Sequence, residues 1–467
     1  MNSTSGSDGK RATQHVHDAV RETVPASFTW DARPLVVVGL SGGLDSVVLA
    51  HVLDALGARI HAVHINYGLR AAAERDQQWI EALCHAKGWT LTVERCAPDR
   101  PGESMQAVAR AQRYSAYLEA AHRQQASWVA VGHHANDQAE TVLLHLMRKS
   151  GPEGLAGMPS VRPMTPDGAV KLIRPLLHVE RQHIQDYAES CGLTWCEDES
   201  NQHAKYRRNR LRHEILPLLE EVQQGSVSNI ARTAQLMRAY VDDTIQPRLE
   251  RLWQEVQMQD GGLLVPDALL DGLPPVWQGR VLLEALRRGL DGLEGRAAQV
   301  EAVLELRQRQ VGRRVTSAGG TVWRCRTGVF IQRASLIPEP ISPIMVANAG
   351  SAQIGRHRLT WARCTHDHPT NLLKPGTLVL DVERTGGTLY VRAWTSGDTL
   401  EPLGMKGTKR VSDLLTDAKV PTYQRAFVPV VCDEQGVVLA VLGVRTSRRA
   451  NVTATTTHIW QLSYTPI

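Results

Sequence analysis

Residues 34–46 read Pro-Leu-Val-Val-Val-Gly-Leu-Ser-Gly-Gly-Leu-Asp-Ser, and this stretch decides the fold of the first part of the chain. An apolar run of strand length ends there at a turn of small residues. The apolar positions that follow, from Val48 to Leu56, recur at helical spacing. The pattern predicts a buried strand, a glycine loop and the first turn of a helix. Unpaired N–H groups at a helix start attract anions, so a phosphate fits at this loop.

The residues of the loop suit a chain of phosphates. Two adjacent glycines let the backbone approach a ligand closely, the two serines add hydroxyl donors, and Asp45 adds a carboxylate that can hold Mg²⁺ bridging phosphates. The alternative is a plain glycine turn followed by an N-cap serine. The spacing matches neither the Walker loop nor the Gly-x-Gly-x-x-Gly fingerprint. The phosphate-binding residues that we predict are Ser41, Gly42, Gly43, Leu44, Asp45 and Ser46.

The composition is that of a globular protein with about three domains. Of the 467 residues, 42% are hydrophobic and 22% are charged. The net charge of +5 is weak evidence for a nucleic-acid partner. Seven cysteines without a C-x-x-C pair argue against a disulfide framework or a metal–sulfur site and favour the cytoplasm. No apolar run approaches the roughly 18 residues of a membrane helix, so we expect no membrane partner.

Strands and helices alternate over the first half of the chain. After the loop helix, we predict strands at 58–65, 90–95 and 127–132, separated by helices at 71–87 and 103–124. Such alternation indicates parallel βαβ units in a doubly wound α/β sheet. Ligands of these sheets bind at the carboxyl ends of the strands.

A second group of polar residues follows the fourth predicted strand. His133 and His134 precede a helix that carries Asp137 and Glu140, which share one helical face because they are three residues apart. First-turn carboxylates are often only solvated groups that the helix dipole favours. Two histidines and two carboxylates at the edge of a sheet favour a site instead. A metal site is a weaker alternative, since no third ligand is evident.

A basic run lies further along, between Lys205 and Arg212. It contains five Lys or Arg residues and no acid. Such a run is either a solvated helix face or a grip on a phosphate backbone. Tyr206, an aromatic ring inside the run, favours RNA.

Beyond residue 217 the pattern changes twice. Residues 218–314 read as helical and rich in arginine, and the later part reads as β-structure. Two-residue turns predict one hairpin at 322–331 and another at 378–394 around Gly386-Gly387. We therefore predict a catalytic α/β domain at 1–217, a helical domain at 218–340 and a β-rich domain at 341–467.

Taken together, these motifs resemble those of the tRNA(Ile)-lysidine synthetase family of N-type ATP pyrophosphatases. The resemblance covers most of the chain, in the family's order. It rests on Ser41–Ser46, on His64, Asn66, Gly68, Leu69 and Arg70, on Ala109, Arg110, Arg113 and Tyr114, on His133–Thr141, on Gly154–Met158, on Arg174–Leu177, on Glu197–Asn201, and on Tyr206, Arg208, Asn209, Arg210 and Arg212.

The resemblance implies an ATP-dependent ligation. ATP adenylates O2 of the wobble cytidine in a tRNA(Ile) with a CAU anticodon, and diphosphate leaves. The ε-amine of free L-lysine then attacks C2 and expels AMP. The resemblance also implies that the two later domains recognise the acceptor-stem side of the tRNA. A homodimer is one option for the assembly.

The resemblance further assigns roles to residues. It places the ATP phosphates on the Ser41–Ser46 loop, with His64 and Asn66 beside them and Mg²⁺ on Asp45. Asp137 and Glu140 would hold the lysine ammonium, and one of them would take its proton. His133 would assist the phosphates or the proton transfer. The residues expected to position RNA or the adenylate are Arg70, Arg110, Arg113, Arg208 and Arg212.

Three departures and three rivals accompany this assignment. Tyr67 stands where many members have histidine, and Lys149 replaces the glycine that is common after Arg148. The C-terminal Arg-Arg-x-Gly-Asp signature survives only as Gly397-Asp398 near Arg392. A tRNA thiolase would need paired cysteines, and an amidotransferase such as GMP synthetase would need a glutaminase site. A non-enzymatic RNA-binding protein would explain the basic run but not the phosphate loop.

Overall fold

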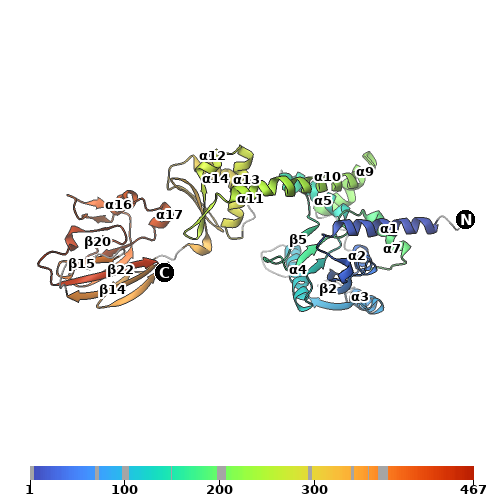
Figure 1. Ribbon diagram of the computed structural model, residues 1–467, viewed down its shortest axis with the longest axis horizontal. Coiled ribbons are helices and arrows are strands. Elements are labelled where there is room, and N and C mark those ends of the chain that lie inside the picture. Colours follow the sequence, from blue (N-terminus) through green and yellow to red (C-terminus); the bar gives the residue numbers. More distant parts are fainter. Residues whose placement is uncertain are drawn as a thin grey trace. The chain divides into compact units, whose positions relative to one another are not determined.

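The computed structural model of the chain has two compact units, Met1–Pro247 and Arg248–Ile467 (Figure 1). Each unit has hydrophobic clusters of its own. The described residues are 5–68, 73–96, 105–148, 150–196, 207–292, 297–337, 341–355, 357–365 and 377–466. Among them, no helix is both long enough and apolar enough to cross a bilayer.

A six-stranded sheet forms the centre of the first unit, in the order β3-β2-β1-β4-β6-β5. Neighbouring strands are parallel except β5 and β6, which are antiparallel. The chain starts at a central strand and winds outward in both directions, which confirms the predicted doubly wound sheet. The strands are β1 Leu35–Gly39, β2 Arg59–Asn66, β3 Thr90–Arg95, β4 Trp128–Ala130, β5 Val161–Pro163 and β6 Lys171–Ile173.

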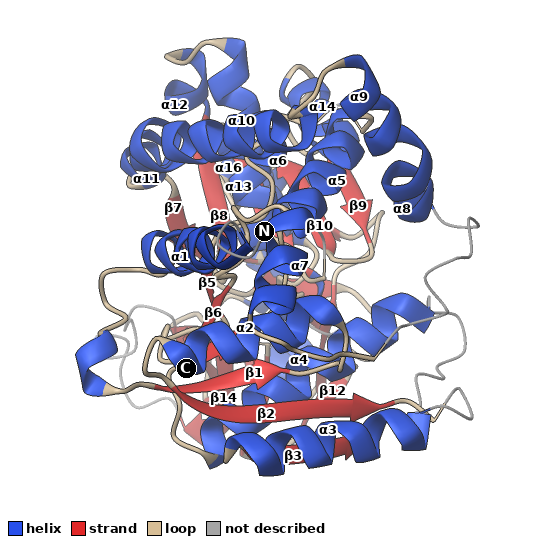
Figure 2. Cartoon of the chain, turned by 90° about the vertical axis from the view of Figure 1, so that its right-hand side faces the viewer, coloured by secondary structure: helices blue, strands red, loops and turns tan. Residues whose placement is uncertain are grey.

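Helices cover both faces of this sheet (Figure 2). In β1, Val36 and Val38 pack into one cluster with α1, α2, α3 and α7, whereas Val37 packs into another with α4. Successive side chains of a strand point to opposite faces, so an unbroken valine run needs cover on both sides. The bounds are α1 Ser5–Thr23, α2 Leu44–Ala55, α3 Ala73–Lys87, α4 Met105–Arg123 and α7 Arg181–Ser190.

A helical layer completes the first unit and packs on α5, Ala135–Leu146. Ala135 and Ala139 of α5 are buried against Leu216, Val227 and Ala231 of two later helices. This packing brings the basic segment that precedes Leu216 alongside α5. The bounds are α6 Pro152–Leu155, α8 Arg207–Arg210, the π-helical turn η3 Leu211–Ile215, α9 Leu216–Val222, α10 Ser226–Tyr240 and the π-helical turn η4 Val241–Ile245. The next helix, α11 Gln246–Trp253, begins in the first unit, and its Leu249 packs into the core of the second.

The second unit begins with an antiparallel sheet in the order β7-β8-β11-β10-β9. The hairpin predicted at 322–331 is confirmed, because β10 pairs directly with β11. The prediction that 218–314 is helical, with turns at 261–262 and 274–275, is wrong at β7 and β8, where the apolar residues of β8 pair with the distant strand β11. The bounds are β7 Gln257–Gln259, β8 Gly262–Pro266, α12 Asp267–Asp271, α13 Pro275–Gly289, α14 Ala297–Arg307, β9 Arg314–Ser317, β10 Gly320–Arg324 and β11 Gly328–Arg333.

Two further sheets build the C-terminal part, in the orders β12-β16-β19-β20-β21 and β13-β14-β22-β15. The main strands are β12 Ile344–Val346, β13 Gly350–Ile354, β14 His357–Thr365, β15 Thr377–Asp381, β16 Leu389–Ala393, β19 Pro429–Cys432, β20 Val438–Val441, β21 Arg445–Thr446 and β22 His458–Pro466. Smaller elements are η5 Ala334–Leu336, α15 Val382–Thr385, the pair β17 Thr399–Leu400 and β18 Lys409–Arg410, α16 Val411–Asp417, α17 Thr422–Arg425 and η6 Arg448–Ala450.

The hairpin predicted at 378–394 is wrong. Its two strands, β15 and β16, belong to different sheets and are separated by the short helix α15. The Asp381 carboxylate caps that helix by accepting hydrogen bonds from the backbone N–H groups of Glu383 and Arg384, at 2.9 and 3.1 Å. The two glycines, with φ of 80° and 94°, therefore end a helix and redirect the chain to the other sheet.

Candidate active site

The loop between β1 and α2 holds its own shape through the two serines. The Ser46 hydroxyl donates to the carbonyl of Gly43 at 2.9 Å and accepts from the N–H of Ser41 at 3.2 Å. The Ser41 hydroxyl, 3.1 Å from that of Ser46, belongs to an exposed residue. Ser46 thus shapes the loop from inside, and Ser41 is the hydroxyl that faces solvent.

Gly42 is the position in this loop that requires glycine. Its φ of +88° lies in the left-handed region, and a Cβ built there would approach Ile80 Cδ1 to 3.2 Å. The Gly42 carbonyl also accepts a hydrogen bond from the N–H of Cys196 at 2.9 Å. The loop is therefore held by the segment that follows α7.

Asp45 lies in the first turn of α2 with about one third of its side chain exposed. Its Oδ2 is 3.7 Å from Nε2 of His134, whereas its buried Oδ1 has no hydrogen-bond partner. An unsatisfied carboxylate oxygen beside a phosphate loop fits a hard cation, and Mg²⁺ is typically held by one or two carboxylates plus substrate phosphates. Among the described residues, no group of three His, Cys, Asp or Glu side chains is placed to hold a metal ion without such phosphates.

The start of α5 lies beside Asp45 because β1 and β4 are neighbours in the sheet. The Val38–Ala130 pair brings the ends of these strands together, and a Cβ on Gly132 would lie 3.0 Å from the Asp45 carbonyl oxygen. At the helix start, Oδ2 of Asp137 accepts from the backbone N–H of His134 at 3.1 Å. The predicted meeting of the two polar groups at the carboxyl edge of the sheet is thus seen between Asp45, His134 and Asp137.

The two carboxylates of α5 are clasped by two arginines of the basic run. Arg208 donates to Glu140 Oε2 at 2.5 Å and to Asp137 Oδ1 at 3.1 Å. Arg212 donates to Glu140 Oε1 at 2.6 Å and to the same Asp137 oxygen at 2.9 Å. Glu140 has no exposed surface. We call these four residues, Asp137, Glu140, Arg208 and Arg212, the carboxylate–arginine clasp.

The charge balance of the clasp keeps Asp137 ionised. Burial by itself opposes the carboxylate, but the neighbouring His134 and the two guanidinium groups outweigh it and lower the pKa of Asp137. Two carboxylates and two guanidinium groups sum to zero charge. The sequence suggested separate roles for the carboxylates and the arginines, whereas the structure pairs them with each other.

His133 is oriented by a buried arginine. Arg174, which is 3% exposed, donates from Nε to Nδ1 of His133 at 3.1 Å and from Nη1 to the carbonyl of Pro159 at 2.6 Å. A guanidinium only donates hydrogen bonds, so Nδ1 of His133 is the acceptor and the ring proton is on Nε2. Burial lowers the pKa of His133 to about 3. The side chain is therefore a neutral hydrogen-bond donor and a poor proton acceptor.

The other predicted residues lie around this cluster. His64 is buried, and its Nδ1 donates to the carbonyl of Leu40 at 3.0 Å, so it supports the phosphate loop from the neighbouring strand. Asn66 accepts from the N–H of Gly68 at 2.9 Å and shapes the turn after β2. Arg70 lies outside the described residues.

Two arginines of α4 make contacts of a different kind. Arg110 lies over the ring of Tyr114, 5.1 Å from its centroid. Arg113 donates to the hydroxyl of Tyr67 at 3.2 Å, and that hydroxyl donates to the carbonyl of Ala109 at 3.2 Å. Tyr67, the departure from the family's usual histidine, thus ties the end of β2 to α4. Both arginines belong to the exposed residues of α4.

Two residues of the cluster had no assigned role in the sequence analysis. His134 lies within the His133–Thr141 motif, and Arg174 begins the Arg174–Leu177 motif, but neither pattern indicates a role for the single residue. The motifs mark both residues as parts of a site, but the residues that they contact are far away in sequence and cannot be found from the motifs alone. The partner of Arg174 is 41 residues away, and the contact of His134 with Asp45 joins two separate strand–helix turns.

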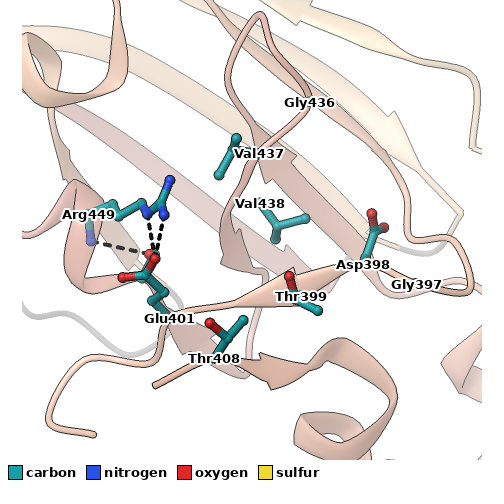
Figure 3. A pocket seen from close by; sticks show the side chains of 10 residues that line it. Gly397, Asp398, Thr399, Glu401, Thr408, Gly436, Val437, Val438 and Arg449 are labelled. Atoms are coloured by element: carbon teal, nitrogen blue, oxygen red, sulfur yellow. Dashed lines mark hydrogen bonds and ion pairs between the residues drawn. The ribbon is translucent and has the colours of Figure 1, made fainter. Parts of the chain in front are cut away.

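The C-terminal part has a polar cavity of about 360 Å³ (Figure 3). Two carboxylates line it, and both are neutralised. Asp398 accepts from both terminal nitrogens of Arg392, at 2.7 and 2.9 Å, and Glu401 accepts from Arg448 at 2.6 Å and from Arg449 at 2.7 Å. The shortened Gly-Asp signature therefore still anchors an arginine.

The chain resembles known proteins along most of its length. A relative from Chromobacterium violaceum, named tRNA(Ile)-lysidine synthase, is 34% identical over 435 residues, which cover 88% of this chain and 92% of the relative. A relative of the same name from Symbiobacterium thermophilum is 34% identical over 477 residues, which cover 92% and 94%. The chain belongs to the tRNA(Ile)-lysidine synthase family. This membership confirms the resemblance drawn from the motifs and the prediction of an enzyme.

Two family models each match one region of this family member. Residues 13–219 match the PP-loop domain, and residues 389–464 match the TilS substrate C-terminal domain. The candidate active site lies wholly within the first of these regions. Among solved structures, a U34-tRNA thiolase from Methanococcus maripaludis is 18% identical with a TM-score of 0.42, over 50% of this chain and 80% of that chain.

The conformation of Gly42 predicts the effect of a single methyl group. We expect Gly42→Ala to weaken ATP binding at least about tenfold and to lower stability by about 1–2 kcal/mol, because alanine is strained at this φ. Nucleotide binding by calorimetry and urea unfolding measure the two effects. Gly57→Ala is the control, since its φ is also positive but its Cβ would meet no atom within 4 Å. Equal ATP affinity in both variants would contradict the assigned role of the loop.

The buried neutral His133 predicts a pH dependence of stability. The unfolded chain binds a proton at this residue below its ordinary pKa of 6.5, whereas the folded chain does so only near pH 3. The stabilisation is therefore present above pH 6.5 and is lost as the pH falls from 6.5 toward 3. The urea midpoint of the wild type should fall more steeply over this range than that of His133→Gln. Parallel curves would contradict a neutral His133.

Proposed function

We propose that the chain ligates L-lysine to C2 of the wobble cytidine of a tRNA(Ile) with a CAU anticodon, consuming ATP and releasing AMP and diphosphate. The observation that carries this proposal is the meeting of the phosphate loop, Asp45 and the carboxylate–arginine clasp at one edge of the sheet. Family membership supplies the substrate class, and the residues supply a chemical rationale for each step.

The first step joins cytidine O2 to the α-phosphorus of ATP. The Ser41 hydroxyl and the N–H groups at the start of α2 bind the phosphates and hold the departing diphosphate. Asp45, with its unsatisfied Oδ1, is the residue that would hold Mg²⁺, which neutralises phosphate charge when bound. His133 donates a hydrogen bond from Nε2 toward the adenylate without adding charge. Its low pKa assigns it to phosphate binding rather than to proton transfer.

The second step places the lysine ε-amine opposite C2. We assign the ammonium to the carboxylates of Asp137 and Glu140, because opposite charge and ready hydrogen-bond acceptors suit it. The lowered pKa of Asp137 makes it a binder of cations rather than a base. The amine gives a proton to Glu140 or to water before or during its attack, the C2–N bond forms, and the C2–O bond breaks so that AMP leaves with the former O2.

The ammonium of lysine can bind the two carboxylates only if the arginines of the clasp release them. Arg208 and Arg212 already occupy oxygens of both carboxylates, so the ammonium competes with two guanidinium groups. We infer that the arginines turn toward phosphates of the tRNA or the adenylate when these bind. The same side chains would then serve both of the roles that the sequence suggested, one in the free protein and one in the complex.

The direct test is mass spectrometry of tRNA(Ile)(CAU) after incubation with the protein, ATP and L-lysine. The expected product carries one lysine at the wobble base, and its formation requires all three substrates. Asp137→Asn should abolish this adduct while tRNA affinity stays within about threefold of wild type, since the change removes a charge that holds the ammonium. Equal losses of adduct and of tRNA affinity, in a folded variant, would contradict the lysine role of Asp137.

Asp45→Ala should reduce tRNA-dependent AMP formation at least about 100-fold, because a loss of charge stabilisation on the leaving diphosphate acts on the chemical step. Release of AMP from labelled ATP measures this effect. Asp54→Ala is the matched control, since it removes an exposed carboxylate from the same helix. Similar rates for the two variants would rule out the assignment of Asp45.

Within the basic run, the two arginines of the clasp can be compared with an arginine that lies outside it. Arg208→Gln and Arg212→Gln should each weaken tRNA binding and reduce its salt dependence by about one counterion. Arg210→Gln, which alters an exposed arginine paired with Glu214 on the same turn, should have little effect. Filter binding across a salt series measures both quantities. A salt slope that all three variants share with the wild type would assign the clasp a purely structural role.

A further inference from the structure

The segment that follows α6 is held against α5 by the side chain of Gln138. Helix α6 packs beside both α5 and α10 (Figure 2). Nε2 of Gln138 donates to the carbonyl of Met158 at 3.0 Å, and Oε1 accepts from the N–H of the same residue at 2.8 Å. Gln138 is 1% exposed. One buried amide thus satisfies both backbone groups of one residue, and we call residues 157–159 the strap.

Gly157 allows the strap to approach this amide. Its φ of +58° lies in the left-handed region, and a Cβ built on it would lie 2.6 Å from Oε1 and 2.9 Å from Nε2 of Gln138. From α10, Arg238 donates to the carbonyl of Gly157 at 3.0 Å. The amide of Gln138 therefore fits the strap only because residue 157 has no side chain.

The strap ends at Pro159, whose carbonyl accepts a hydrogen bond from Nη1 of Arg174 at 2.6 Å. This carbonyl is fixed from both sides along the chain. Gln138 holds Met158 on one side. On the other side, the N–H of Arg174 donates to the carbonyl of Ser160 at 2.9 Å and extends the antiparallel pairing of β5 with β6. The proline ring also fixes φ at residue 159.

Arg174 depends on this carbonyl because it is a buried cation. Two of its partners, the Pro159 carbonyl and Nδ1 of His133, are neutral acceptors. A buried guanidinium N–H that loses its acceptor is costly. The N–H groups of a guanidinium also lie in a fixed planar fork. A shift of the Pro159 carbonyl therefore turns the whole group, and Nδ1 of His133 loses its donor.

We propose that Gln138 is a positioning residue of the ligation reaction, which keeps His133 as an Nε2 donor by way of the strap and Arg174. The inference rests on the proposed function for the part that His133 plays toward the adenylate. The link from Gln138 to the tautomer of His133 follows from the contacts alone.

Support of the carboxylate–arginine clasp is the competing role, because Gln138 follows Asp137 in the sequence. Successive side chains of an α-helix point about 100° apart, whereas residues three apart share a face. Asp137 and Glu140 therefore lie on the face of α5 that meets the two arginines, and Gln138 lies on a neighbouring face that meets the strap. The contacts thus favour a role toward His133.

The direct test measures the tautomer of His133 by nitrogen NMR of the full-length protein with 15N-labelled histidine, at neutral pH and without substrates. The wild type should show an unprotonated Nδ1 and a protonated Nε2, and the signals that His133→Gln lacks identify the residue. Q138L removes both hydrogen bonds at a similar side-chain size. Its two His133 shifts should move toward each other, because the tautomers mix. Wild-type shifts in folded Q138L would overturn the proposal.

L53A is the control for a general loss of stability. Leu53 has no exposed surface and lies at the far end of α2 from Asp45. Its truncation should lower the urea midpoint but leave the His133 shifts unchanged. Shifts in L53A as large as those in Q138L would overturn the proposal. G157A reaches the same contact from the strap, since its Cβ would displace the amide, and it should move the His133 signals even where Q138L does not fold.

R174K tests the route of the effect. Lysine keeps the charge but replaces the planar fork with one terminal nitrogen, so the His133 tautomers should mix as in Q138L. The double variant Q138L/R174K should show no further change, because residues that act along one route are not additive. A further change as large as that of Q138L alone would show that Gln138 acts by another route, and it would overturn the proposal.

Steady-state kinetics of tRNA-dependent AMP formation separate the two roles. In Q138L, kcat should fall at least about tenfold, because a hydrogen bond to the developing adenylate acts on the chemical step. KM for L-lysine should stay within about twofold. A raised KM for lysine with wild-type kcat and His133 shifts would assign Gln138 to the clasp and overturn the proposal. Failure of the proposed function would look different, since the His133 signals would still respond to Q138L while the wild type incorporates no lysine.

Discussion

Glu140 is an ionisable side chain with no exposed surface, and the active-site edge of the first unit is organised by the need to satisfy it. A buried carboxylate is costly unless hydrogen bonds and opposite charge compensate it, and removal of one partner of a buried pair costs about 3–5 kcal/mol. Arg208 and Arg212 provide that compensation from a segment far along the chain. The docking of α9 and α10 on α5 and the formation of the clasp therefore depend on each other.

The clasp also explains how one site can hold groups of both signs. In the proposed reaction, the ATP phosphates would bind at the N–H groups and Asp45 at the start of α2, and the lysine ammonium would bind at the carboxylates of α5. His134 lies between the two, with Nε2 3.7 Å from Asp45 and 3.5 Å from Asp137. A site with a phosphate-binding side and a cation-binding side suits a reaction in which an anionic group leaves and an amine attacks. Arg174 fixes the tautomer of His133 by donating a hydrogen bond to its Nδ1.

Much of the first unit was predictable because its signals are local. The valine run of β1, the glycine loop and the helix that starts after it follow one another within about twenty residues, and alternation of strands and helices restricts the topology. The second unit was less predictable for a physical reason. β8 is a strand because it pairs with β11, and β15 and β16 separate into two sheets because Asp381 caps a helical turn between them.

The sequence by itself determined the doubly wound sheet, the phosphate loop and the edge at which the chemistry is expected, because strand burial, glycine conformation and helix-start N–H groups are properties of short segments. It also identified the family through motifs in order. Only the tertiary structure decided which charges neutralise each other. Asp137 and Glu140 are three residues apart, but their partners Arg208 and Arg212 reach them only after the helical layer has packed. Likewise, the tautomer of His133 depends on Arg174, which a neighbouring strand brings into contact.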